Sequence, residues 1–221
     1  MSKGLTEIVY ILDRSGSMEG LEKDTIGGFN SMMEKQKKTG GNALVSTVLF
    51  DDEIEILHDR IPIEKVEKMT DKQYFARGCT ALLDAVGGAI DHIGKIHKNA
   101  SDDAKPDKTL FIITTDGLEN SSCKYSYNKI KEMVNRQQKK YGWEFIFIGA
   151  NIDAYEEASR FGISNQYAVN YHHDALGTQM VYKALGKAVS HYMDVEGNTS
   201  GNAFAGSDWR EELDEDFKNR S

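Results

Sequence analysis

Three oxygen-bearing side chains alternate along a short stretch near the N-terminus: Asp13, Ser15 and Ser17, in the sequence DRSGS. An apolar run ends immediately before them, so they begin where a strand is expected to end. Side chains at positions i, i+2 and i+4 can converge only if a turn folds them around a common centre. One acid and two hydroxyls could bind a hard cation, bind a phosphate or cap a helix. Other residues of the chain are needed to choose among these three roles.

Two more short oxygen side chains stand at comparable places. Thr80, in GCTAL, comes just before an apolar helix pattern, and Asp116, in TTDG, comes directly after an apolar strand pattern. Taken singly, each signal is weak, because a Thr before a helix is usually its cap and an Asp-Gly after a strand is usually a turn. Taken together, two carboxylates and three hydroxyls are the donor set that a hard divalent cation prefers.

The elements that must position these residues alternate between strand and helix patterns, which is typical of a layered α/β fold. Strands are expected near residues 8–12, 43–50, 53–57, 110–113, 143–149 and 167–169, and helices over 21–38, 82–93, 125–140, 154–161 and 175–194. The tight turn at Asp51-Asp52 indicates a hairpin. We therefore predict a doubly wound, mostly parallel sheet with one antiparallel edge strand and helices on both faces. Loops beyond the carboxyl ends of its strands would bring the five side chains to one rim.

This combination resembles a von Willebrand factor type A (VWA) domain with an intact metal-ion-dependent adhesion site (MIDAS). The family pattern is D-x-S-x-S, then a Thr some tens of residues later, then an Asp after the fourth strand. The chain matches it at Asp13, Ser15, Ser17, Thr80 and Asp116, and the flanking sequences SGSM, GCTALLDA and TDGLEN are usual in bacterial and phage members. The resemblance covers residues 5–194, which we expect to form one VWA domain with a Rossmann-like fold.

The resemblance implies a role for each matched residue. Ser15, Ser17 and Thr80 would bind the cation directly, and Asp13 and Asp116 would act largely through bound water. The ion would be Mg²⁺ or Mn²⁺, with Ca²⁺ less suitable. Because the hydroxyl ligands are neutral, an open coordination position would favour a carboxylate from a partner protein. The implied function is a metal-dependent protein-binding module rather than an enzyme, and the implied partner is an AAA-type ATPase or another member of its gene cluster.

A second class of protein also fits part of the pattern. Magnesium-dependent phosphatases and phosphotransferases of the haloacid dehalogenase type place an Asp after the first strand of a doubly wound sheet. They need a second Asp two residues later as a general acid, and this chain has Ser15 there. A serine hydrolase is less compatible, since no G-x-S-x-G elbow occurs. The phosphatase therefore remains the alternative to the binding module.

Composition limits the kinds of partner and the cellular compartment that we expect for this chain. The chain has 221 residues with 35 acidic and 27 basic side chains, and a net charge of −8 argues against nucleic acid or an anionic membrane surface as the main partner. No apolar run approaches the ~18–20 residues of a membrane span. The N-terminal stretch lacks the apolar block and cleavage site of a signal peptide. With only two cysteines, we expect a reducing cytoplasm.

Four further features carry weaker expectations. The run His172-His173-Asp174 could suit a transition-metal ion, but we predict a solvent-facing loop before the last helix of the domain. Cys79 and Cys123 are expected to be free thiols near the rim. Asp84 is expected to hydrogen-bond to the backbone of the rim rather than bind metal. Gly27-Gly28 destabilises its helix relative to Ala, and close packing of that helix on the sheet would compensate.

The tail, residues 195–221, has a different character. A small-residue linker leads to a charged segment, and seven acidic against three basic residues give the tail half of the net charge. Asp208, followed three residues later by Glu211, predicts a short helix. Trp209, Leu213 and Phe217 would form its apolar face. From the length of the linker we expect this helix to dock on the body away from the metal, or on another molecule.

Overall fold

A computed structural model of the chain describes residues 4–195, 204 and 208–220. Its centre is a six-stranded sheet in the order β3-β2-β1-β4-β5-β6. The strands are β1 (Thr6–Asp13), β2 (Ala43–Phe50), β3 (Ile54–Pro62), β4 (Lys108–Thr115), β5 (Glu144–Gly149) and β6 (Ala168–Asn170). All neighbouring pairs are parallel except β2 with β3, which forms the antiparallel edge. The predicted sheet is confirmed.

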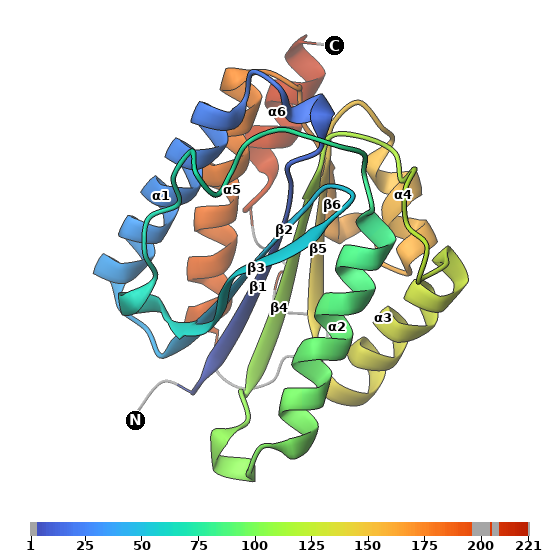
Figure 1. The fold of residues 1–221 in the computed structure, drawn as a ribbon. Helices are drawn as coiled ribbons and strands as arrows, with labels where there is room; N and C mark the ends of the chain where they lie inside the picture. The colour runs from blue at the N-terminus through green and yellow to red at the C-terminus, as the bar shows by residue number, and fades with distance from the viewer. Residues whose placement is uncertain (1–3, 196–203, 205–207, 221) are drawn as a thin grey trace.

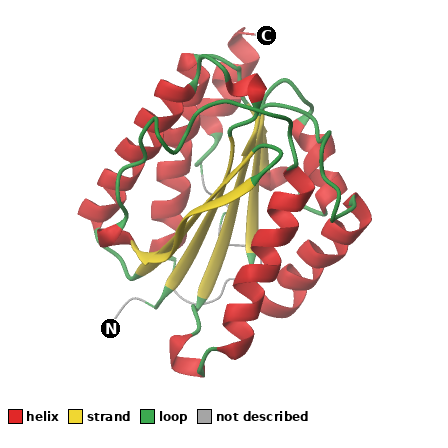
Figure 2. Ribbon diagram, in the orientation of Figure 1, coloured by secondary structure: helices red, strands yellow, loops and turns green. Residues whose placement is uncertain are grey.

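Helices cover both faces of the sheet (Figures 1 and 2). They are α1 (Glu22–Thr39), α2 (Leu82–Asn99), α3 (Tyr127–Tyr141), α4 (Ala154–Phe161), α5 (Ala175–Asp194) and α6 (Glu211–Arg220). α1 and α5 lie on one face with α6 beside α5, while α2, α3 and α4 lie on the other. In residues 4–195 and 208–220, none of the helices combines the length and apolarity that a bilayer crossing requires. The fold is a doubly wound α/β fold, as predicted.

The two strands that carry the candidate site are buried on both faces. Every residue of β1 and of β4 is buried, which explains why each has a continuous apolar run instead of an alternating pattern. They pair in parallel, with Leu12 opposite Thr114, so both end at the same edge of the sheet. We call this edge, with the loops that follow β1, β4, β5 and β6 and the segment before α2, the rim.

α1 packs against α5 rather than directly on the sheet at its paired glycines. A Cβ placed on Gly28 would lie 2.3 Å from Cδ2 of Tyr182 in α5, whereas a Cβ on Gly27 would meet nothing within 4 Å. The expectation of close packing at this point is therefore confirmed for Gly28, but its partner is a helix and not the sheet. Only one of the two glycines is required by that contact.

α6 confirms the predicted terminal helix but corrects its position. Leu213 is fully buried, and the helix packs on α5 and β6. Its far end contacts the loop after β6, where the ring of Phe217 stacks on His172 and Arg220 pairs with Asp174. The expected docking away from the rim is therefore wrong. The expectation considered only the length of the linker and not the length of the helix, whose ten residues add about 15 Å of reach. Residues 196–203 and 205–207 of the linker lie outside the described part of the chain.

Candidate metal centre

Backbone hydrogen bonds join three separate segments at the rim. The turn after β1 is tied to the segment before α2, because the N–H of Gly16 donates to the carbonyl of Gly78 at 3.1 Å. That segment is tied in turn to the loop after β4. The N–H of Thr80 donates to Oδ1 of Asn120 at 2.9 Å, and the N–H of Asn120 donates to the carbonyl of Thr80 at 3.1 Å. Asn120 therefore has a structural role, in which it ties the loop after β4 to the segment before α2.

Four of the five predicted donors form a continuous chain of contacts. The N–H of Ser15 donates to Oδ1 of Asp13 at 2.7 Å, and the hydroxyls of Ser15 and Ser17 are 3.0 Å apart. The hydroxyl of Ser17 then donates to Oδ1 of Asp116 at 2.6 Å. β1 and β4 make this possible, since their adjacent ends bring together residues that are far apart in the sequence.

The fifth donor, Thr80, reaches the same place across Gly117. A Cβ on Gly117 would lie 3.6 Å from Oγ of Ser17 and 3.8 Å from Oγ1 of Thr80. Both hydroxyls therefore lie against the one residue of the TTDG segment that has no side chain. The structure thus gathers all five predicted residues at the rim.

The two carboxylates of the centre are buried. Asp13 is 2% exposed and Asp116 is 1% exposed. Burial raises the pKa of Asp13 to about 6, and the charge of Asp116 adds to the rise, against the opposing hydrogen bonds from Ser15 and Thr115. Burial likewise raises the pKa of Asp116, against the opposing effects of the Ser17 hydroxyl and the His173 ring. A bound cation would remove the cost of both negative charges.

Arg14, the cation inside the DRSGS motif, does not balance these charges. Its buried guanidinium is directed to the hairpin of β2 and β3, where Nε donates to Oδ2 of Asp51 at 2.8 Å and Nη1 donates to Oε2 of Glu55 at 2.7 Å. Nη1 also donates to the carbonyl of Gln73 at 3.1 Å. Arg14 therefore anchors the motif from behind, and its charge is balanced by acids outside the centre.

His173 corrects the prediction of a solvent-facing loop. Its Nε2 lies 2.7 Å from Oδ2 of Asp116, and its side chain is 22% exposed. The loop reaches the centre because the ends of β4, β5 and β6 are linked: the N–H of Ala150 donates to the carbonyl of Thr115 and that of Tyr171 to the carbonyl of Gly149, each at 3.0 Å. The sequence places His173 shortly after a predicted strand, but its local pattern does not indicate the contact with Asp116.

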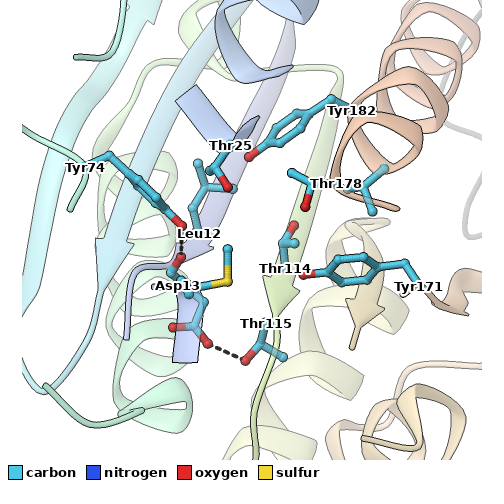
Figure 3. Close-up of a pocket in the computed structure, with 11 residues that line it drawn as sticks. Leu12, Asp13, Thr25, Tyr74, Thr114, Thr115, Tyr171, Thr178 and Tyr182 are labelled. Carbon is cyan, nitrogen blue, oxygen red and sulfur yellow. Dashed lines mark hydrogen bonds between the residues drawn. The ribbon is translucent and has the colours of Figure 1, made fainter. Parts of the chain in front are cut away.

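Supporting hydrogen bonds fix the orientation of the donors. The hydroxyl of Thr115 donates to Oδ2 of Asp13 at 2.6 Å, and the hydroxyl of Tyr74 donates to the carbonyl of Asp13 (Figure 3). Sequence reasoning missed both, although Thr115 lies next to Asp116 in the motif. Asp84 accepts three N–H groups of the loop after β4, as expected, from Cys123, Lys124 and Tyr125. Cys79 and Cys123 are exposed free thiols.

A small cavity of about 10 Å³ lies behind Asp13, between the sheet, α1 and α5 (Figure 3). Hydroxyls of Thr25, Thr114 and Thr178 line it, and their oxygens have no hydrogen-bond partner within the described residues. A cavity of this volume with unpartnered hydroxyls in its wall has room for about one water molecule. It is too small for an organic ligand, so the chemistry of the region belongs to the rim.

The donor atoms fit a divalent cation. Ligands held at about 2.1 Å from one ion lie roughly 3 Å apart when they are adjacent, and the contacts Ser15–Ser17 and Ser17–Asp116 measure 3.0 and 2.6 Å. Oδ2 of Asp116 is buried and has no hydrogen-bond partner among the described residues. In the same part of the chain, no three His, Cys, Asp or Glu side chains form a group that could hold a metal by themselves. The centre therefore depends on its hydroxyl donors.

Comparison with known proteins supports the fold. No protein-family model and no curated protein matches the sequence. Among solved structures, proximal thread matrix protein 1 of the mussel byssus with a zinc-occupied MIDAS motif is similar with a TM-score of 0.57 and 12% identity, over 85% of this chain and 48% of that chain. Manganese-loaded TRAP protein of Plasmodium vivax is similar with a TM-score of 0.55 and 17% identity, over 83% of this chain and 74% of that chain.

A third similar structure is the PilB minor pilin of Streptococcus sanguinis, with a TM-score of 0.55 and 14% identity, over 86% of this chain and 62% of that chain. The chain thus spans about half the length of the byssus protein and less than two thirds of the pilin. At these identities the likeness establishes the shared VWA-type fold.

Proposed function

We propose that this chain is a metal-dependent protein-binding module and not an enzyme. One observation carries the proposal: the buried carboxylates of Asp13 and Asp116 share one rim with three hydroxyl donors, and Arg14 is turned away from them. A divalent cation held by Ser15, Ser17 and Thr80 would neutralise the two carboxylates. The metal would supply a Lewis-acidic position for a carboxylate from another protein.

The donor set also guides the choice of ion and partner. Five residues that offer only oxygen suit Mg²⁺ or Mn²⁺ better than Ca²⁺, which takes more ligands. The neighbour with a zinc-occupied MIDAS motif and the manganese-loaded neighbour support a divalent ion as the ligand. An Asp or Glu of a partner protein would complete the coordination. A cytoplasmic location is carried by the low cysteine count, and an AAA-type ATPase as the partner is carried by the family resemblance alone.

A metal-linked stability measurement tests the site. If Mg²⁺ or Mn²⁺ binds only the folded chain, 100 times its Kd stabilises by about 2.7 kcal/mol, or roughly 5–10 °C in Tm. Ser15→Ala and Thr80→Ala should abolish this shift, because each removes a direct donor. Ser121→Ala, which removes a hydroxyl from the same rim outside the donor set, should keep it. Equal shifts in all four proteins would refute the assignment.

Two further experiments separate the candidate functions. Capture of a protein from the source cell by the wild-type chain should require the metal, and should be lost with chelator and in the Thr80→Ala chain. A phosphatase would instead hydrolyse a generic phosphomonoester in the presence of Mg²⁺ and lose that activity in the Asp13→Asn chain. We expect no hydrolysis, since Ser15 stands where the general acid of such enzymes is needed.

A further inference from the structure

We propose that Nε2 of His173 is an additional ligand of the metal, and that the centre therefore binds a first-row transition ion such as Mn²⁺ or Zn²⁺ more tightly than Mg²⁺. This inference rests on the proposed function, because it names a ligand and an ion for the same centre. It adds a nitrogen donor to a set that the sequence motif supplies only with oxygen.

The contact between His173 and Asp116 has the distance of a strong interaction without the geometry of a hydrogen bond. Nε2 of His173 and Oδ2 of Asp116 are 2.7 Å apart. Both atoms are buried, and within the described residues neither has a hydrogen-bond partner. The two atoms are in ion-pair contact without the geometry of a hydrogen bond, so the cost of burying them is only partly offset. One ion bound directly by both atoms would offset the rest of this cost, because adjacent ligands of a cation lie about 3 Å apart. Asp116 would then be a direct ligand instead of acting through bound water.

The loop that carries His173 is held on both sides. His172 stacks on Phe217 with ring centroids 4.7 Å apart, and its Nε2 lies 3.1 Å from the carbonyl oxygen of Phe217. On the other side, Oδ1 of Asp174 accepts the N–H of Gly177 at 2.7 Å at the start of α5, and Oδ2 pairs with Arg220. His173 is therefore fixed beside Asp116 by its neighbours, which is the preorganisation that a metal ligand needs.

Imidazole changes the preference of a site among ions. Mg²⁺ favours oxygen ligands, whereas imidazole suits Zn²⁺, and the affinity of a mixed nitrogen and oxygen site for first-row ions rises from Mn²⁺, the weakest of them, towards Cu²⁺. The imidazole also adds no negative charge. The centre thus keeps the positive character that attracts a partner carboxylate.

The experiment compares the full chain without a histidine tag, its His173→Gln variant and a control, His92→Gln. His92 lies on α2 and is paired with Asp59 on β3, so the control removes one imidazole outside the rim. Titration calorimetry gives the Kd of Mg²⁺ and of Mn²⁺. Pulsed electron paramagnetic resonance of the Mn²⁺ protein, with ¹⁵N-labelled histidine, detects a directly bound imidazole.

We expect the wild-type chain to bind Mn²⁺ more tightly than Mg²⁺ and to show coupling of Mn²⁺ to one histidine nitrogen. His173→Gln should lose that coupling and weaken Mn²⁺ binding by roughly tenfold or more while Mg²⁺ binding changes little. His92→Gln should match the wild type. Absence of histidine coupling in the wild-type Mn²⁺ protein overturns the inference, and so does an equal loss of both affinities in His173→Gln. Failure of the wild type to bind either ion overturns the proposed function instead.

Discussion

Ser17 and Asp116, 99 residues apart in the sequence, are joined by a hydrogen bond of 2.6 Å from Oγ of Ser17 to Oδ1 of Asp116. The bond exists because β1 and β4 are neighbours in the sheet although two strands and two helices separate them in the chain. The partner of Asp116 in this bond is a neutral hydroxyl, which balances the negative charge only in part. The positive charge of Arg14 does not contribute, because its guanidinium faces the hairpin of β2 and β3.

The first prediction concerns the pH dependence of stability in chelator. The pKa of Asp13 is raised from 3.8 to about 6 by burial in the folded chain. The folded chain therefore holds this proton more tightly than the unfolded chain does between these values. The free energy of unfolding should fall as pH rises from about 4 to about 6, by roughly 3 kcal/mol for this group, and then level off.

The control for this prediction is the Asp13→Asn chain, because carboxylates with lowered pKa, such as Asp51, impose an opposite slope at lower pH. Subtracting the urea-unfolding profile of the variant from that of the wild type isolates the contribution of Asp13. Above pH 6, in chelator, the variant should be the more stable protein. A flat difference profile would contradict the buried, unbalanced carboxylate that the proposed metal centre requires.

The second prediction uses the paired glycines of α1. Gly28→Ala should destabilise the fold by about 1–3 kcal/mol, because its Cβ would lie 2.3 Å from the ring of Tyr182 and force α1 away from α5. Gly27→Ala should stabilise by about 0.5–1 kcal/mol, since it removes backbone freedom from the unfolded chain at an uncrowded helical position. Urea unfolding of both variants checks this. The prediction is wrong if both substitutions change the free energy of unfolding in the same direction.

The third prediction concerns Arg14. Arg14→Met should destabilise the chain by at least about 3 kcal/mol, because it leaves the fully buried Asp51 with less compensation. Arg77, which also pairs with Asp51, is the matched control; its side chain is 40% exposed, so Arg77→Ala should cost clearly less. Urea unfolding in chelator gives both values. Equal costs would mean that Arg14 is not the principal anchor of the motif.

Local patterns predict the sheet well, and they predict where along the chain the five oxygen side chains stand. Asp13 and Asp116 each end an apolar run, and Thr80 precedes one, so their positions relative to strands and helices can be read along the chain. Their convergence follows from the general rule that parallel strands end at one edge. The role of these residues as metal ligands stays a prediction, which the variants of Ser15 and Thr80 test.

Features that depend on contacts between distant elements were predicted less well. No local pattern shows that the loop after β6 reaches Asp116, because this depends on the linked ends of β4, β5 and β6. For the same reason the sequence indicates close packing at Gly28 but not that Tyr182 of α5 is the partner. The direction in which α6 returns along α5 is a tertiary property of the same kind.

The last prediction concerns α6, whose end holds the loop that carries His173. Phe217→Ala together with Arg220→Ala removes the ring stacked on His172 and the cation paired with Asp174. The body of the helix should stay docked, because Leu213 remains buried and Glu212 remains paired with Lys183 and Lys187. We expect faster hydrogen exchange in residues 171–175 and a several-fold weaker affinity for Mn²⁺, with little change for Mg²⁺. The control is Lys218→Ala, which changes an exposed residue of the same helix and should have neither effect. If hydrogen exchange is unchanged in the double variant, α6 does not position His173. If exchange is faster but the affinity for Mn²⁺ is unchanged, the order of this loop does not matter for the metal.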